Sequence, residues 1–145
     1  AVKAEGGRDI VPQIKAILAE GVPFLGHLGM LPQHVLEEGG YRVKGKTETE
    51  REALLADAKA LEEAGAFGIV LELIAASVAE EISKTVNIPT IGIGAGKKCD
   101  GQVLVTTDLW GTSPGFIPKH VKPKFEIGER MRLAIREWQK EIREA

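Results

Sequence analysis

The chain has 145 residues, of which 43% are hydrophobic and 28% are charged. This composition is typical of a globular domain and excludes disordered and fibrous chains. Nineteen basic residues against 21 acidic ones give a net charge of -2, which provides no basic field to attract nucleic acid or an anionic membrane.

Cysteine content and hydrophobic run length set two further limits. Cys99 is the sole cysteine, so an internal disulfide and a zinc site built on several cysteines are excluded, and we expect a packing or loop thiol. No run approaches the ~18 apolar residues of a membrane span, and the first residues lack the pattern of a signal peptide. We therefore expect a cytoplasmic protein that binds neither nucleic acid nor membrane.

The chain opens on a hydrophobic run, AVKAEGG, which starts at Ala1 without a Met, as if cut within a strand. The spacing of apolar residues then predicts a helix over residues 10–20. Asp9 is its expected N-cap, Pro12 is tolerated in its first turn, and Gly21 is expected to close it.

A second run, VPFLGHLG at residues 22–29, predicts another strand, and the Gly-rich segment up to residue 45 carries little periodicity. Connections of this length are more often functional than structural. Thr49 and Glu52 have the spacing of a capping box for the next helix, and Gly65 is its expected C-cap.

The second half of the chain repeats the same rhythm. AFGIVLE at residues 66–72 predicts a buried strand, residues 75–86 a helix, TIGIGAG a fourth strand, and GQVLVTTD at residues 101–108 a fifth. A stretch rich in Pro and Gly, residues 111–123, predicts a loop.

The last twenty residues are expected to form one more helix, because apolar residues recur there at helical spacing. These residues are Ile127, Met131, Ala134, Ile135, Trp138 and Ile142. Apolar strands that alternate with amphipathic helices predict a parallel α/β sheet, either open or part of a (β/α)8 barrel. A complete barrel needs ~200 residues or more, so five strands would be just over half of one.

Each hydrophobic run ends in a polar or glycine-rich corner, and these corners carry Glu5, His27, Glu72, Gly94 to Gly96 and Asp108. The carboxyl ends of parallel strands share one edge of the sheet, where α/β folds build active sites. We therefore expect these positions to face a common site.

Glu72 is the strongest candidate for chemistry, because it ends an apolar run and is followed by more apolar residues. A carboxylate is costly to desolvate in such a place, which suits a general base. The alternative is a carboxylate that caps the next helix or pairs with a lysine.

Lys3 and Glu5 lie two residues apart on a strand, so both side chains point to the same face. The lysine can hold a substrate carboxylate and the glutamate can ligate a hard cation such as Mg²⁺, although a plain salt bridge has the same spacing. His27 lies between two glycines, where it can face a pocket or be structural. His34 and His120 show no ligand spacing with it.

Gly92, Gly94 and Gly96 suggest a dinucleotide fingerprint, but the third glycine comes one residue early and no helix is expected behind it. Close approach of the backbone to a ligand or a neighbouring strand explains these glycines better. Asp108 is interpreted as an anchor for a site residue or as a strand-end cap.

Several longer blocks are similar to one known family. AVKAEGG, PFLGHLGMLPQ, GGYRVKGK, ALEEAGAFGIVLE, IPTIGIGAGKKCDGQVLV and PGFIPKHVK resemble, in the same order, the ketopantoate hydroxymethyltransferases. The resemblance implies a (β/α)8 barrel of the phosphoenolpyruvate/pyruvate type, with residues 1–145 forming about strands 4 to 8 of one barrel domain. It also implies a homo-oligomer, a decamer in that family.

The implied reaction transfers a hydroxymethyl group from 5,10-methylenetetrahydrofolate to 3-methyl-2-oxobutanoate, giving ketopantoate for pantothenate and coenzyme A synthesis. By the same resemblance, Lys3 and His27 bind the 2-oxo acid, Glu5 belongs to a Mg²⁺ site, and Glu72 is the base that removes the C3 proton.

The resemblance also implies that the first three strands and two metal-binding aspartates come from an N-terminal half of the same protein. We expect that half as a partner, because a single Glu binds Mg²⁺ weakly and an open barrel leaves strand edges unpaired. Two alternatives remain: another Mg²⁺-dependent carbon-carbon enzyme acting on 2-oxo acids, and a non-catalytic fragment of a barrel.

Overall fold

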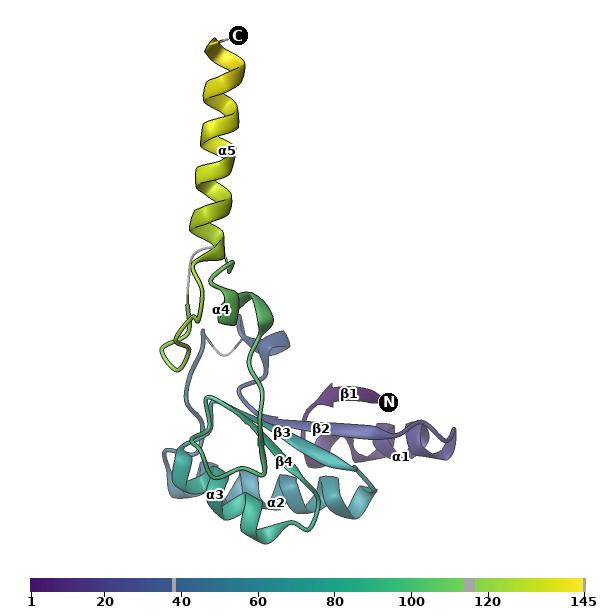
Figure 1. Cartoon of the computed structure of the whole chain (residues 1–145). Coiled ribbons are helices and arrows are strands. Elements are labelled where there is room, and N and C mark those ends of the chain that lie inside the picture. The colour runs from purple at the N-terminus through teal and green to yellow at the C-terminus, as the bar shows by residue number, and fades with distance from the viewer. Residues whose placement is uncertain (38, 114–116, 145) are drawn as a thin grey trace. The chain divides into compact units, whose positions relative to one another are not determined.

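A computed structural model describes residues 1–37, 39–113 and 117–144 (Figure 1). The chain divides into two compact units, Ala1–Val103 and Leu104–Ala145. The first unit holds the strands and the residues proposed for chemistry, and the second is helical. Each unit is described by itself.

The first unit is built on a five-stranded parallel sheet whose strands lie side by side in chain order. The strands are β1 (Val2–Glu5), β2 (Phe24–Gly29), β3 (Gly68–Glu72), β4 (Thr90–Ile93) and β5 (Gly101–Gln102). Doubly wound sheets reverse their strand order at a switch point, whereas barrels do not. A sheet that keeps chain order is therefore compatible with a sector of a barrel.

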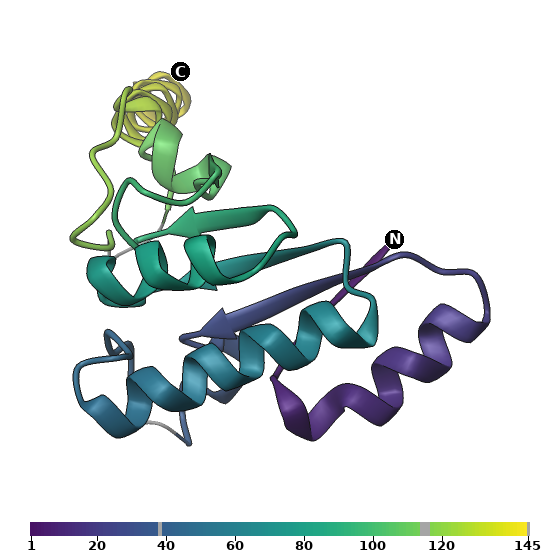
Figure 2. The same cartoon turned by 90° about the horizontal axis from the view of Figure 1, so that it is seen from below.

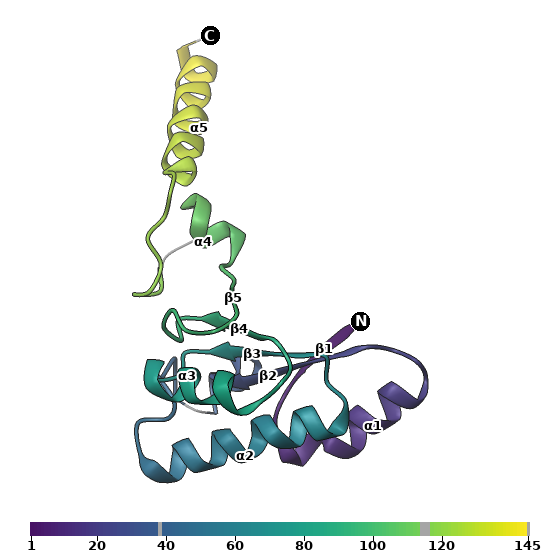
Figure 3. The same cartoon turned by 60° about the horizontal axis from the view of Figure 1, so that its bottom comes forward.

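Three helices of the described first unit pack on a single side of this sheet, as the two turned views show (Figures 2 and 3). They are α1 (Val11–Ala19), α2 (Glu48–Ala64) and α3 (Ala76–Thr85), and two short 3-10 turns, Arg8–Ile10 and Pro32–His34, complete the unit. Helices on one face of a parallel sheet, with the other face open, are what a barrel sector requires. The predicted α/β class is confirmed at this level.

The core lies between the sheet and these helices. Alternate residues of the strands are buried in this core, among them Phe24, Leu28, Ile69 and Leu71. The residues between them point to the opposite face, because side chains alternate along a strand. The alternation of residues along the strands thus gives the sheet one face that packs against the helices and an opposite face that carries the side chains proposed for chemistry.

The helix predicted over residues 10–20 is present, but Asp9 does not cap it. Its Oδ1 instead accepts a hydrogen bond from the backbone N–H of Gly7 at 2.9 Å, and Arg8–Ile10 forms a 3-10 turn before α1 begins at Val11. A short Asp side chain often bonds to nearby backbone in this way, which removes it from the capping position. Pro12 in the first turn is confirmed.

The capping box of α2 lies one half-turn earlier than predicted. Thr47, not Thr49, is the N-cap: its hydroxyl accepts the N–H of Glu50 at 3.2 Å, and Glu50 Oε2 accepts the N–H of Lys46 at 2.8 Å. The hydrogen bond from the backbone N–H of Lys46 is the main cause that holds the pKa of the Glu50 carboxyl below its usual range. The chain contains two overlapping Thr-x-x-Glu patterns, and the structure uses the earlier one. Gly65 closes the helix at a φ of 102°, as predicted.

The fifth strand is much shorter than the predicted run of residues 101–108. Only Gly101 and Gln102 pair with β4, and the hydrophobic residues after them are exposed. In the described part of the chain β5 has a neighbour on one side only, so no second ladder extends it. A Cβ on Gly92 would lie only 3.0 Å from side-chain atoms of Cys99 and Gln102, which supports the prediction that this glycine permits close approach of a neighbouring segment.

The second unit contains α4 (Thr106–Trp110) and α5 (Ile127–Glu144). The predicted last helix is confirmed as α5, and the apolar residues along it are exposed, among them Met131, Trp138 and Ile142. The expected loop over residues 111–123 has no helix or strand where it is described, and its residues 114–116 lie outside the described residues. Among the helices of the described chain, none combines the length and apolar character needed to cross a membrane.

Candidate active site

The open face of the sheet carries the polar residues of β1. Ala4 packs against the core, so Lys3 and Glu5, on either side of it, point to the opposite face. Register places Glu5 directly beside His27 of β2. Three side chains predicted to share one site therefore come from two neighbouring strands.

His27 lies at the centre of this group and is 3% exposed. Its Nδ1 lies 2.9 Å from the Nζ of Lys3 and 4.0 Å from the Oε1 of Glu5. The first distance is that of a hydrogen bond and the second is a longer electrostatic contact. His27 is a buried imidazole with charged groups on its Nδ1 side.

Glu72 is the last residue of β3 and completes the group on the other side of His27. Its Oε2 lies 3.2 Å from His27 Nε2, and its side chain is 17% exposed. The N–H direction of Nε2 is not aligned on that oxygen, and Nε2 has no hydrogen-bond partner among the described residues. The four residues predicted for the site, Lys3, Glu5, His27 and Glu72, are thus brought together by β1, β2 and β3.

The backbone around Glu72 is held by close contacts. Its carbonyl oxygen accepts the N–H of Met30 at 2.8 Å, and a side chain on Gly29 would clash with that same oxygen. The next residue, Leu73, has a φ of 48°, and its N–H donates to Ile93 at 2.9 Å. A non-glycine residue in the left-handed region costs about 1 kcal/mol or more and is found preferentially at functional sites.

Sequence reasoning missed these backbone features. Gly29 belongs to the GHLG block, and a glycine at the end of a buried run is a signal for close backbone approach. Leu73 carries no such signal, because nothing in a leucine side chain predicts positive φ. Its conformation follows from the backbone bonds to neighbouring segments, including the N–H of Lys44, which donates to the Leu73 carbonyl at 2.8 Å.

The Gly-rich segment after β2 also reaches the site. The backbone N–H of Gln33, in the 3-10 turn Pro32–His34, donates to Glu5 Oε2 at 3.1 Å. The prediction that this segment is functional has support from this contact, apart from Glu38, which lies outside the described residues. Glu5 is therefore held from two sides, by His27 and by the segment.

Other predicted positions do not join this group. Gly94 to Gly96 follow β4 as a loop, and Gly96 packs against Ala76. Asp108 was expected at a strand end, but it lies within α4 of the second unit, where its carboxylate accepts the hydroxyl of Ser113. Asp108 does not lie at a strand end because the fifth strand already ends at Gln102.

The sheet also has a structural polar cluster, at the start of β4. The carboxylate of Asp100 accepts both the backbone N–H and the hydroxyl of Thr90 at 2.8 Å. These hydrogen bonds, the backbone one first, hold the pKa of Asp100 below its usual range. Thr90 is fully buried and also contacts the Ser83 hydroxyl at 2.7 Å. The cluster fixes the turn between β4 and β5.

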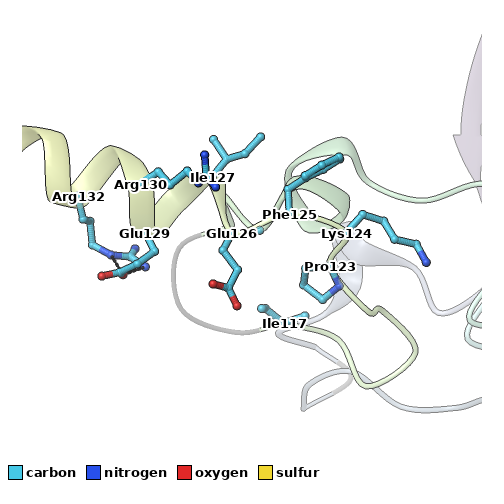
Figure 4. Close-up of a pocket in the computed structure, with 10 residues that line it drawn as sticks. Ile117, Pro123, Lys124, Phe125, Glu126, Ile127, Glu129, Arg130 and Arg132 are labelled. Carbon is cyan, nitrogen blue, oxygen red and sulfur yellow. Dashed lines mark hydrogen bonds and ion pairs between the residues drawn. The ribbon is translucent and has the colours of Figure 1, made fainter.

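A separate hollow lies within the second unit, next to the start of α5 (Figure 4). Apolar side chains of Ile117, Phe125 and Ile127 line it together with charged ones, of which Glu129 and Arg132 pair at 2.9 Å. None of the four candidate residues lines this hollow.

The donor set of the candidate site suits Mg²⁺ only in part. Glu5 and Glu72 offer the carboxylate oxygens that this ion prefers. In the described residues, however, no three His, Cys, Asp or Glu side chains are placed to hold a metal ion together. The described residues therefore do not form a complete metal site by themselves.

A parallel α/β sheet that gathers two carboxylates, an imidazole and an ammonium at its strand ends is typical of α/β enzymes, which build their active sites at this edge of the sheet. Comparison with known proteins narrows the class. All 145 residues match the family Ketopantoate hydroxymethyltransferase, and the chain belongs to that family.

Relatives named 3-methyl-2-oxobutanoate hydroxymethyltransferase are similar over nearly the whole chain. The protein of Clostridium botulinum is 52% identical over 135 residues, which are 93% of this chain and 49% of the relative. Those of Thermotoga maritima and Ignicoccus hospitalis are 48% and 49% identical over 143 residues, 99% of this chain and 53% and 54% of the relatives. The chain thus spans about half the length of the curated relatives it matches.

Proposed function

We propose that the protein to which this chain belongs transfers a hydroxymethyl group from 5,10-methylenetetrahydrofolate to 3-methyl-2-oxobutanoate, forming ketopantoate for pantothenate and coenzyme A synthesis. Family membership and the names of the relatives support the reaction. The single observation that carries the proposal is the position of Glu72, at the end of β3 and 3.2 Å from buried His27.

In this proposal Glu72 is the general base. Its carboxylate takes the proton from C3 of 3-methyl-2-oxobutanoate, and the electrons of the broken C–H bond form the enolate. The enolate carbon then forms the new C–C bond to the folate-borne methylene carbon, whose two C–N bonds to the folate break. One water molecule supplies the hydroxyl group, and the proton from C3 and the second proton of the water go to the two nitrogens of the departing tetrahydrofolate. A carboxylate that is mostly shielded from water, with a fixed backbone, is suited to this step.

Lys3 would bind the substrate carboxylate, beside His27, the other residue that the sequence predicted to bind it. The ammonium of Lys3 has three N–H donors, and one faces His27 Nδ1 at 2.9 Å. Two remain for the substrate carboxylate. Lys3 is exposed and His27 is buried, so the lysine is the accessible member of the pair.

Glu5 would be this chain's ligand to Mg²⁺. When bound, the ion supplies Lewis-acid stabilisation of negative charge on the keto oxygen. The contacts of Glu5 with Gln33 and His27 hold its carboxylate on the open face of the sheet.

We also propose that the chain forms about strands 4 to 8 of a (β/α)8 barrel of the phosphoenolpyruvate/pyruvate type, completed by an N-terminal half of the same protein. The one-sided helix layer and the strands in chain order support a barrel sector. The length of the relatives is consistent with a second half. That half would supply two aspartates and cover the open face. A homo-oligomer is supported by the exposed apolar residues of α5.

The test compares Glu72→Gln with Glu52→Gln in the whole protein. Glu52 is an exposed residue of α2 outside the site and is the matched control. We expect Glu72→Gln to lower both ketopantoate formation and Mg²⁺-dependent exchange of the C3 proton for deuterium at least ~10³-fold, because the base is lost. Glu52→Gln should retain both. Wild-type activity in Glu72→Gln would refute the role of Glu72, and no exchange by the wild type would refute the proposed function.

A further inference from the structure

His27 lies between a group that can only donate hydrogen bonds and a group that can only accept them. On its Nδ1 side is the ammonium of Lys3 at 2.9 Å, and on its Nε2 side is the carboxylate of Glu72 at 3.2 Å. A lysine ammonium has three N–H donors and no acceptor, and an ionised carboxylate has acceptors only. This arrangement decides where the imidazole carries its proton.

Because Lys3 donates to Nδ1, that nitrogen must present a lone pair. The single proton of the neutral ring then resides on Nε2 and faces Glu72. The opposite tautomer would set an N–H of His27 against an N–H of Lys3 and a lone pair against a carboxylate, two repulsive contacts at a side chain that is 3% exposed. Glu5, at 4.0 Å from Nδ1, is too distant to replace Lys3 as the hydrogen-bond partner.

The ring orientation follows from the same contacts. The two charged groups nearest to the His27 ring, those of Lys3 and Glu72, each lie at a ring nitrogen. A ring turned by 180° about its bond to Cβ would place carbon atoms against an ammonium and a carboxylate. The placement of the two nitrogens is therefore fixed by the charges of Lys3 and Glu72.

Nε2 is buried and has no aligned hydrogen-bond partner among the described residues. A buried polar atom without a partner costs about 1–3 kcal/mol, and the nearest acceptor is Glu72 Oε2. The Glu72 backbone is held by Met30, and Leu73 is held by Ile93. Because these backbone positions are held, the alignment of Nε2–H on Glu72 must come from the two side chains. Oε2 then accepts the hydrogen bond from His27 Nε2–H, and Oε1 remains to receive a proton from the substrate.

We propose that Lys3 sets the tautomer of His27, and that His27 Nε2–H positions the Glu72 carboxylate for proton removal. His27 is then a positioning residue for the base and not a ligand of the substrate. The inference rests on the proposed function, since it assumes that Glu72 takes a proton. Lys3 serves two purposes, because its remaining donors stay available to a substrate carboxylate.

The tautomer can be observed without any reaction. The whole protein, with ¹⁵N-labelled histidine and without substrate, should show one non-protonated Nδ1 and one protonated Nε2 for His27 at neutral pH. The His27 signals are assigned as those that disappear in His27→Asn. In Lys3→Met the donor to Nδ1 is lost, so the His27 signals should move toward a mixture of tautomers. A protonated Nδ1 in the wild-type protein would overturn the proposal.

Two substitutions of His27 separate positioning from substrate binding. Gln places its amide N–H₂ near the position of Nε2 and so keeps a donor to Glu72, whereas the shorter Asn does not. We expect His27→Asn to lower kcat for C3 deuterium exchange ~10²-fold and His27→Gln to lower it less than ~10-fold, with KM changed less than ~3-fold in both. His120, an exposed residue of the second unit, is the control: His120→Gln should behave as wild type.

The results separate failure of the positioning role of His27 from failure of the proposed reaction. A rise in KM with kcat unchanged in both His27 variants would assign His27 to substrate binding and overturn the positioning role. Equal loss of kcat in Gln and Asn would also overturn it. If the wild-type protein exchanges no deuterium, the proposed function fails, while the nitrogen signals of His27 still report whether the tautomer is the one inferred.

Discussion

Helices α3 and α5 were both predicted from apolar residues at helical spacing, yet only α3 buries its apolar face. Val78, Ala79 and Ile82 of α3 are buried in the core of the first unit. On α5 the one buried residue among those described is Gly128, and Ile135 is 53% exposed. Periodicity thus predicts a helix and its apolar side, but it does not reveal which surface covers that side.

The largest expected effect comes from a matched pair of isoleucines. Ile82→Ala should lower the free energy of unfolding by about 2–5 kcal/mol, because it leaves a cavity in a core where Ile82 is fully buried. Ile135→Ala removes an exposed side chain and should change it by no more than about 0.5 kcal/mol. Urea denaturation of the 145-residue chain measures both values.

Equal losses in the two variants would contradict the comparison. They would mean that the apolar side of α5 is covered in solution, by a second copy of the chain or by another surface. Analytical ultracentrifugation of the same samples identifies self-association, since a covered α5 face that depends on a second copy makes the Ile135→Ala effect depend on protein concentration.

A smaller effect on the free energy of unfolding is expected from removing one hydroxyl group within each unit. Thr90→Val removes a fully buried hydroxyl that donates to Asp100 and contacts Ser83, so we expect a loss of about 2 kcal/mol. Ser113→Ala in the second unit removes a hydroxyl that donates to Asp108 in a more exposed place, so the loss should stay below about 1 kcal/mol. A larger loss for Ser113→Ala would reverse the ranking of the two units.

The smallest expected effect depends on pH. The pKa of Asp100 in the folded protein lies below its usual value, so its ionised form stabilises the fold above about pH 4, and this contribution is lost as the pH falls through the folded-state pKa. Asp100→Asn has no such contribution. The gap in urea midpoint between wild type and Asp100→Asn should therefore narrow from pH 7 to pH 3, and a gap that widens in acid would contradict the assignment.

Much of the first unit could be predicted from sequence, because its signals are local. Alternation along the strands predicted that Lys3 and Glu5 share a face, and the polar end of an apolar run identified Glu72. Parallel register then brought these residues beside His27. To predict that these residues, distant in sequence, lie close together required only the rule that the carboxyl ends of parallel strands share one edge of the sheet.

Predictions from the sequence failed where two local sequence patterns competed or where tertiary contacts determined the structure. Thr47 and Thr49 head equivalent patterns, and only the folded chain selects Thr47. Among the described residues, no second strand pairs with the hydrophobic run after Gln102, and this run is exposed. The positive φ of Leu73 is set by hydrogen bonds from segments distant in sequence. The precise orientation of Glu72 is therefore the part of the candidate site that sequence alone does not predict.

The most direct test of the central claim is deuterium exchange at C3 of 3-methyl-2-oxobutanoate with Mg²⁺, measured by NMR for this chain alone and after addition of the N-terminal half of the protein. If β1, β2 and β3 carry the base and its supports while the other half completes the metal site, exchange should require both halves and disappear in Glu72→Gln. Exchange that persists in Glu72→Gln, or that never appears when both halves are present, would contradict the account.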